Sequence, residues 1–254
     1  MSEPLRSVNL DEAARGVYID FEGGGSVRRS FLGILWQNDD GDTAYRIDLL
    51  DTVLWPLADI DPDPYRQHFA CADLTDTLQE LKTRAEVENR LVFAYSEHES
   101  RMIEEHLGDC SLNEWWQENL VDGRKVAKRW KTSENKKRKE QHKEQIVFPP
   151  KEGQTTQNHS LQNFLHLIDY HVPTDYSVGV VATALSLVRT ELQSTNELTL
   201  SDEAAHAWLQ AVMHNLHDCL GLRELMIRCG TDKPRVPEKD QSAIDELKRL
   251  LGGS

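Results

Sequence analysis

Two carboxylates, Asp20 and Glu22, end an apolar segment near the start of the chain. The segment reads Val-Tyr-Ile-Asp-Phe-Glu over residues 17–22 and is followed by three glycines. Side chains alternate faces along a strand, so we expect Asp20 and Glu22 on one face while Ile19 and Phe21 point into the opposite layer. Like charges at this spacing repel, and a divalent cation between them would stabilise both. The pattern therefore indicates a metal-dependent phosphoryl-transfer site; the alternative is a solvent-facing strand end.

Further acids are needed, because a two-metal site must hold two cations about 3.5 to 4 Å apart. Glu99 follows the apolar segment 91–95 at the start of an expected helix, and Asp218 lies inside a long apolar helix. An unpaired acid inside an apolar helix is costly, whereas a bound cation could stabilise its charge. For Glu99 the alternative is an acid favoured by the helix dipole, and Asp122 is then the reserve ligand.

His214 lies one helical turn before Asp218, so the two side chains share a face. A histidine titrates near neutral pH and could orient or deprotonate an attacking water. His217, or no histidine, are the alternatives. A zinc site built from His206, His214, His217 and Cys219 is disfavoured, because positions 214, 217 and 219 cannot converge from one helix face.

Apolar spacing predicts the elements that position these residues. An antiparallel meander is expected over residues 17–22, 30–36 and 43–50, followed by a proline-rich loop over 56–66. A helix over 73–89, a strand over 91–95 and a helix capped by Ser96 should follow. Helices are also expected over 160–168, 178–192 and 201–229. Strands early and helices late favour an α/β or α+β arrangement of layers.

Composition limits the function classes. The chain has 254 residues, 39% hydrophobic content and a net charge of −14, which fits one globular domain and argues against nonspecific coating of nucleic acid. No apolar stretch approaches the roughly 20 residues of a membrane helix, and the first residues do not resemble a signal peptide. We therefore expect no membrane contact and a cytoplasmic location. The four cysteines lack a C-x-x-C pair, so they are expected to be reduced.

One basic segment stands apart from the acidic remainder. Residues 124–144 hold ten lysines and arginines against three glutamates, a local charge of +7. The segment is expected to be a long exposed helix or a mobile insertion within residues 124–150 of a single domain spanning 1–254. Its basic side chains form either a solvated face or a surface that contacts nucleic acid. Trp115, Trp116 and Trp130 are core residues or stack on unpaired bases.

Three motifs, in order, resemble the ribonuclease H-like superfamily of DEDD-type exonucleases, and within it the branch described as predicted RecB-family nucleases. The first is Tyr-Ile-Asp-Phe-Glu-Gly at 18–23, the second Phe-Ala-Tyr-Ser-Glu-His-Glu at 93–99, and the third His-Asn-Leu-His-Asp-Cys at 214–219. Weaker likenesses lie at 121–123 and 160–164. The glutamate at position 99 differs from the aspartate usual in the wider superfamily, although it matches the branch. The histidine at position 214 departs from the branch, which usually has tyrosine there.

The resemblance implies a ribonuclease H-like mixed sheet, antiparallel first and then parallel, with flanking helices. It implies a metal-dependent nuclease, a 3′ to 5′ exonuclease acting on a single-stranded end of DNA or RNA. Two Mg²⁺ or Mn²⁺ ions would be held by Asp20, Glu22, Glu99 and Asp218, with His214 assisting the water. The alternative is a catalytically silent module that binds nucleic acid or a protein partner in a repair complex. DNA against RNA, and exo against endo cleavage, stay open.

Overall fold

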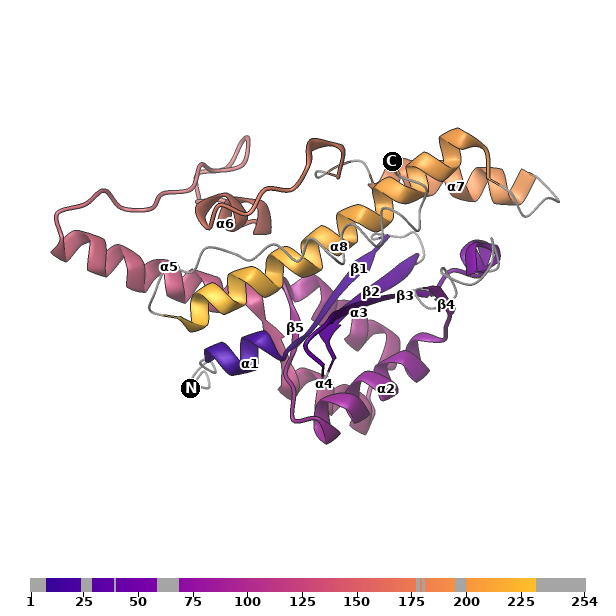
Figure 1. Cartoon of the computed structure of the whole chain (residues 1–254), viewed down its shortest axis with the longest axis horizontal. Coiled ribbons are helices and arrows are strands. Elements are labelled where there is room, and N and C mark those ends of the chain that lie inside the picture. Colours follow the sequence, from indigo (N-terminus) through magenta and orange to yellow (C-terminus); the bar gives the residue numbers. More distant parts are fainter. Residues whose placement is uncertain are drawn as a thin grey trace.

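The structure is a computed structural model that describes residues 8–23, 29–38, 40–58, 69–176, 179, 181–194 and 200–231. Its strands are β1 (Val17–Glu22), β2 (Phe31–Gln37), β3 (Thr43–Leu49), β4 (Phe69–Cys71), β5 (Val92–Ala94) and β6 (Leu120–Asp122). Within these residues they form one six-stranded sheet in the order β4-β3-β2-β1-β5-β6. Helices cover both faces of the sheet (Figure 1). The architecture is α/β.

The sheet is mixed, as the sequence predicted. β1, β2 and β3 form an antiparallel meander, and β5 lies parallel to β1 on its other side. β6 is parallel to β5, and β4 is parallel to β3. The four expected strands are confirmed within one or two residues at their ends. β4 and β6 were not predicted: all three of β4, β5 and β6 have three residues, but only β5 lies within an apolar run of five residues, 91–95, that indicates a buried strand.

Helices account for most of the remaining described residues. They are α1 (Leu10–Ala14), η1 (Thr52–Ala58), α2 (Leu74–Val87), α3 (Glu97–Leu107), α4 (Ser111–Asn119), α5 (Gly123–Glu140), α6 (Leu161–Leu167), η3 (Thr174–Tyr176), α7 (Val181–Ser194) and α8 (Asp202–Gly230). The predicted starts at Ser96 and Ser201 are confirmed, since each serine side chain accepts a hydrogen bond from a backbone N–H of the first turn. None of the helices in the described ranges has the length and apolar content needed to cross a bilayer.

The predicted loop over 56–66 is partly wrong. Pro56 lies inside η1, a 3₁₀ helix that begins at Thr52. Pro56 is the fifth of seven residues, and so short a 3₁₀ helix tolerates it because the fixed φ of proline suits the helix and at most one backbone hydrogen bond is lost. Pro62 and Pro64 lie outside the described residues.

One face of the sheet packs against α8. Tyr18 of β1 and Phe31 of β2 are fully buried with α8 residues such as Trp208 and Leu216 in one core. Helices α5, α6 and α7 contact α8 and contribute to the same core. Arg189 of α7 links this layer to the sheet just beyond the end of β3, because its guanidinium pairs with the buried Asp51 at 2.8 Å.

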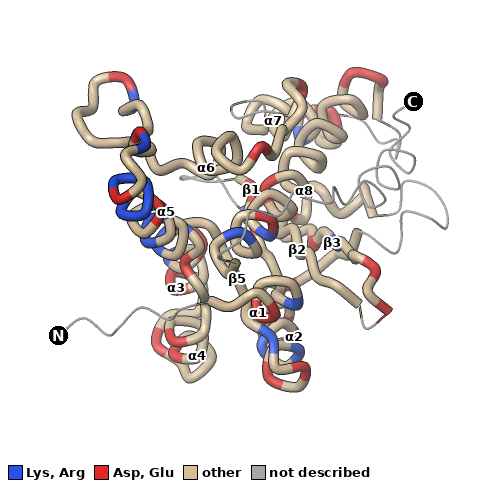
Figure 2. The backbone as a smooth tube through the Cα atoms, turned by 60° about the vertical axis from the view of Figure 1, so that its left-hand side comes forward, with Lys and Arg blue, Asp and Glu red and all other residues tan. Residues whose placement is uncertain are grey.

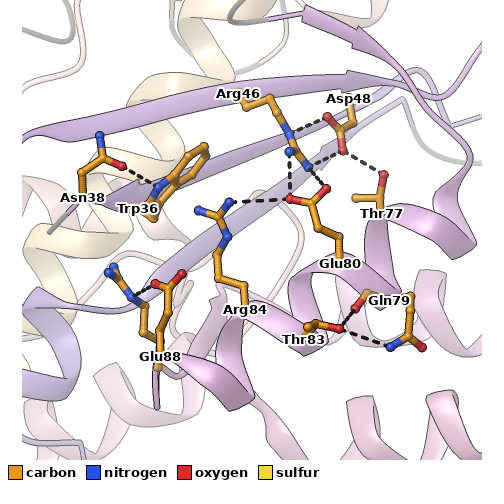
Figure 3. Close-up of polar contacts among 11 residues, drawn as sticks. Trp36, Asn38, Arg46, Asp48, Thr77, Gln79, Glu80, Thr83, Arg84 and Glu88 are labelled. Carbon is orange, nitrogen blue, oxygen red and sulfur yellow. Dashed lines mark hydrogen bonds and ion pairs between the residues drawn. The ribbon is translucent and has the colours of Figure 1, made fainter.

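The opposite face carries α2, α3 and α4. Ile19 and Phe21 of β1 point into this second core, as their alternation with Asp20 and Glu22 predicted. A polar network fixes α2 to β3 (Figure 3). Arg46 of β3 bridges Asp48, at 2.8 Å, and Glu80 of α2, at 3.0 Å. Thr77 also donates to Asp48, at 2.8 Å.

Trp115, Trp116 and Trp130 pack in or against the two cores. Trp116 is 1% exposed, and Trp115 packs partly buried against the same core as α2 and α3. Trp130 is partly buried against the α8 core. The core interpretation is therefore the one that the structure supports over base stacking. None of the four cysteines forms a disulfide.

Candidate active site

The strand β1 places Asp20 and Glu22 on the face that α8 covers. Asp20 lies opposite Gly33 of β2, and Glu22 lies opposite Phe31. Glu22 is 9% exposed and Asp20 is partly buried, so neither carboxylate is a solvent-facing strand end. Besides burial, the charge of Glu22 raises the pKa of Asp20, as expected for two acids on one face of a strand.

Asn215 of α8 connects the helix to Asp20. Its Nδ2 donates to Oδ2 of Asp20 at 2.8 Å and to the Asp20 carbonyl oxygen at 3.0 Å. Its Oδ1 accepts from the hydroxyl of Tyr45 on β3 at 2.7 Å. Gly33 makes this approach possible, because a Cβ at that position would lie 1.6 Å from Oδ1 of Asn215. In the sequence Asn215 was only a letter of the third motif and had no assigned role; its side chain is fully buried, and such an amide must find hydrogen-bond partners.

The same helix presents His214 and Asp218 to the two strand acids. Nε2 of His214 lies 3.6 Å from Oδ2 of Asp218 and 3.9 Å from Oε1 of Glu22. Nδ1 of His214 is 2.7 Å from the carbonyl oxygen of Tyr176. Because a carbonyl only accepts hydrogen bonds, Nδ1 carries the proton. Nε2 therefore faces the carboxylates, and the neutral ring can accept a proton there.

Glu99 reaches the site from the first turn of α3. The helix begins with a capping box, in which Oε2 of Glu99 accepts from the backbone N–H of Ser96 at 3.1 Å and from its hydroxyl at 2.9 Å. Glu99 is 4% exposed. Glu99 therefore is an acid of the first helical turn, as one interpretation of the sequence had it, and it also lines the pocket with Asp20 and Asp218; its role as a metal ligand stays a prediction.

A pocket of about 200 Å³ brings three of these acids together. Asp20, Glu99 and Asp218 line it, from a strand and two different helices. The other lining residues are Ile19, Tyr95, Ser96, Leu161 and Leu222. Residues nearly 200 positions apart in the sequence therefore face one cavity.

The carboxyl groups of the site hold protons more tightly than usual. Burial raises the pKa of Asp20 well above its ordinary value, and the charges of Glu22, Asp218 and Glu99 raise it further. Burial raises the pKa of Glu22 to about 7 although His214 opposes the shift. Burial, with the charge of Glu99, likewise raises the pKa of Asp218. The site concentrates negative charge that a proton or a cation must compensate.

The same negative charges favour the protonated, positively charged form of His214. Burial alone would lower its pKa, but the carboxylates of Asp218 and Glu22 and the Tyr176 carbonyl together raise it. Among the described residues, no lysine or arginine forms an ion pair with the four acids.

The four carboxylates are ligands of the kind that a hard divalent cation takes, although they do not stand close enough together here to enclose one. Carboxylate oxygens are the ligands that Mg²⁺ and Mn²⁺ prefer. Within the described ranges, however, no three His, Cys, Asp or Glu side chains stand close enough to hold a metal ion. Metal binding thus requires the acids to stand closer together than they do in this geometry.

The reserve residues lie elsewhere. Asp122 caps α5 by accepting from the Lys125 N–H at 2.9 Å, and it pairs with the Lys125 ammonium at 3.2 Å. His217 packs in an aromatic group, with Tyr176 stacked on its ring and the Tyr170 hydroxyl 3.1 Å from Nδ1. Of the alternatives left open by the sequence, the structure brings Glu99 and His214 to the pocket acids.

Comparisons with protein-family models, with curated proteins and with solved structures find no match to the chain. A function for the chain is therefore inferred from the site itself and from the motifs that form it.

Proposed function

We propose that this chain is a metal-dependent nuclease that hydrolyses phosphodiester bonds in DNA or RNA, working as a 3′ to 5′ exonuclease. The observation that carries the proposal is the pocket lined by Asp20, Glu99 and Asp218. These acids belong to the three motifs that resemble DEDD-type exonucleases. The mixed sheet, antiparallel and then parallel, is compatible with the ribonuclease H-like fold that the resemblance implies.

Asp20, Glu22, Glu99 and Asp218 are the residues that would hold two Mg²⁺ or Mn²⁺ ions. Such ions, when bound, supply an activated water and stabilise negative charge on the departing oxygen. The protein's own contribution is to keep the acids in place. Asn215 orients Asp20 through its two hydrogen bonds, and Ser96 holds Glu99 at the wall of the pocket.

His214 is suited to take a proton during the reaction. Its Nδ1–H is held by the Tyr176 carbonyl, so the ring presents Nε2 toward Asp218 and Glu22. The two carboxylates stabilise the imidazolium that forms when Nε2 accepts a proton, because they lie within 4 Å of it. In this role Asp218 serves both the ion site and the base.

The test compares two aspartates of the same chain. Asp20→Asn removes a charge from the pocket, whereas Asp122→Asn makes the same change at a helix cap outside it. Labelled single-stranded DNA, duplex DNA and RNA would be incubated with each protein in Mg²⁺ and in Mn²⁺. We expect wild type and Asp122→Asn to shorten the substrate from its 3′ end, and Asp20→Asn to lose activity by at least a hundredfold, since ligands act as a unit.

The alternative, a silent module, gives a different result. It predicts no cleavage by any of the three proteins and no Mn²⁺-dependent rise in the melting temperature of wild type. Equal cleavage by wild type and Asp20→Asn would remove Asp20 from the chemistry and would refute the proposed site.

A further inference from the structure

The outer face of α5 is a basic stripe. Its exposed lysines and arginines are Arg124, Lys125, Lys128, Arg129, Lys136 and Lys139. At 3.6 residues per turn these six positions fall within an arc of about 140°, and neither glutamate of the helix falls inside that arc. Figure 2 shows the concentration of blue along α5, in a chain whose net charge is −14.

The inner face of the helix is occupied. Val126 and Ala127 are buried in the α8 core. Lys131 is only 5% exposed, donates to the Gln157 side chain and lies over the ring of Phe148 at 4.4 Å. Asn135 bonds both backbone groups of Ile146, at 2.6 and 3.0 Å. The residues that follow α5 therefore cover its inner face, and the basic stripe stays exposed to solvent.

The stripe begins next to the acid pocket. The backbone N–H of Arg124 donates to the carbonyl oxygen of Tyr95 at 2.9 Å, and Tyr95 lines the pocket. From Arg124 to Lys139 the helix rises about 22 Å, at about 1.5 Å per residue. One nucleic-acid strand places a phosphate about every 3.4 Å along its helix axis, so this length matches roughly six phosphates.

We propose that the basic stripe of α5 binds the phosphate backbone of the nucleic acid whose end enters the acid pocket. The assignment of the pocket rests on the proposed function, whereas the binding surface stands on the charge and exposure of α5. The contact is with phosphates rather than bases, since Trp115, Trp116 and Trp130 are packed in the two cores and leave no stacking platform among them. Recognition through this face is therefore independent of base sequence.

A nucleic acid fits this face better than a membrane does. A helix that lies on a bilayer inserts an apolar face beneath its basic one. The apolar residues of α5, Val126 and Ala127, are already buried in the protein. Binding of a phosphate backbone requires only the exposed lysines and arginines of the stripe.

The experiment measures binding without cleavage. Fluorescence anisotropy of labelled oligonucleotides of about 20 nucleotides, in EDTA and over a series of salt concentrations, would compare wild type with Lys128→Gln/Lys136→Gln. The matched control, Arg15→Gln/Lys82→Gln, removes the same charge from α1 and α2. Loss of two phosphate contacts should weaken binding roughly 25- to 60-fold at about 0.1 M salt and lower the slope of log K against log salt by about 1.4 to 1.8.

The control variant should bind like wild type, and all variants should keep the wild-type circular dichroism spectrum. The proposal is overturned if the stripe variant binds with unchanged affinity and salt slope, or if both variants weaken binding equally. It is also overturned if wild type binds vesicles containing phosphatidylserine but no oligonucleotide.

Binding and cleavage separate the two proposals. Stripe-dependent binding without cleavage in Mg²⁺ or Mn²⁺ would support the stripe and refute the nuclease. Cleavage that depends on Asp20 but not on Lys128 or Lys136 would support the nuclease and refute the stripe.

Discussion

Raising the pH from about 5 to about 8 in the absence of metal should destabilise the folded chain, and Glu22 should account for a large part of the loss. Burial raises the pKa of Glu22 from its ordinary 4.5 to about 7. The folded state therefore holds this proton more tightly than the unfolded state. The resulting stabilisation is fully present below about pH 4.5 and is lost as the pH rises through about 7.

The magnitude follows from the two pKa values. At about 1.4 kcal/mol per pKa unit, a rise from 4.5 to about 7 corresponds to about 3 kcal/mol of unfolding free energy. His214 adds to the effect with the same sign, because its folded pKa is also raised. A domain of ordinary stability has only 5 to 15 kcal/mol in total, so a loss of this size is readily measured.

The assay is urea unfolding in EDTA at a series of pH values, followed by circular dichroism. Wild type is compared with Glu22→Gln, and Glu118→Gln on the exposed side of α4 is the matched control. Between about pH 5 and pH 8, Glu22→Gln should lose about 3 kcal/mol less than wild type, whereas Glu118→Gln should follow wild type. Mn²⁺ at about a hundred times its dissociation constant should restore about 3 kcal/mol at the upper pH.

The reasoning fails if the unfolding free energy of wild type is constant or rises over this range in EDTA. It also fails if Glu22→Gln shows the wild-type slope. Either result would mean that Glu22 is solvated or already compensated.

Two further substitutions test how the site is held together. Gly33→Ala should cost about 2 to 5 kcal/mol, because the added Cβ would meet Oδ1 of Asn215 and break its bonds to Asp20 and Tyr45. The Cβ would also lie 2.9 Å from the Tyr45 hydroxyl, so in urea unfolding Gly33→Ala/Asn215→Ala should lose less stability than the sum of the two single variants, and an additive loss would contradict the clash. Ser96→Ala should cost about 1 kcal/mol through loss of its cap, as should Ser201→Ala at the start of α8. Only Ser96→Ala should weaken Mn²⁺ binding in a thermal titration, because the Ser96 hydroxyl no longer holds Glu99 at the pocket wall, and an unchanged or tighter affinity would contradict that role.

The elements with clear apolar patterns were predicted, including the short strand β5 within the apolar run 91–95, whereas α1, α4, β4 and β6 were not. β1, β2 and β3 were predicted because six or seven residues are enough to show alternation. β4 and β6 depend on pairing with neighbours that are distant in sequence, which no local pattern reports. The two faces of β1 follow directly from the period of a strand, so the shared orientation of Asp20 and Glu22 was predictable.

Glu99 and Asp218 were selected from the sequence as acids that follow a strand or interrupt an apolar helix, and the family resemblance then grouped them with Asp20 and Glu22 in one site. Their meeting depends on the packing of α3 and α8 against opposite faces of the sheet. The roles of Gly33 and Asn215 were not predictable, because they arise from the register of β1 and β2 and from one close approach of α8.

The continuity of α8 has a mechanical consequence. The helix runs without interruption over 29 residues, a length of about 43 Å, and its two ends pack on α7 and α1. His214, Asn215 and Asp218 keep their mutual spacing when such a stiff rod shifts. A displacement at either end would therefore widen or narrow the gap between Asp218 and Asp20, so perturbations far from the pocket can change its shape.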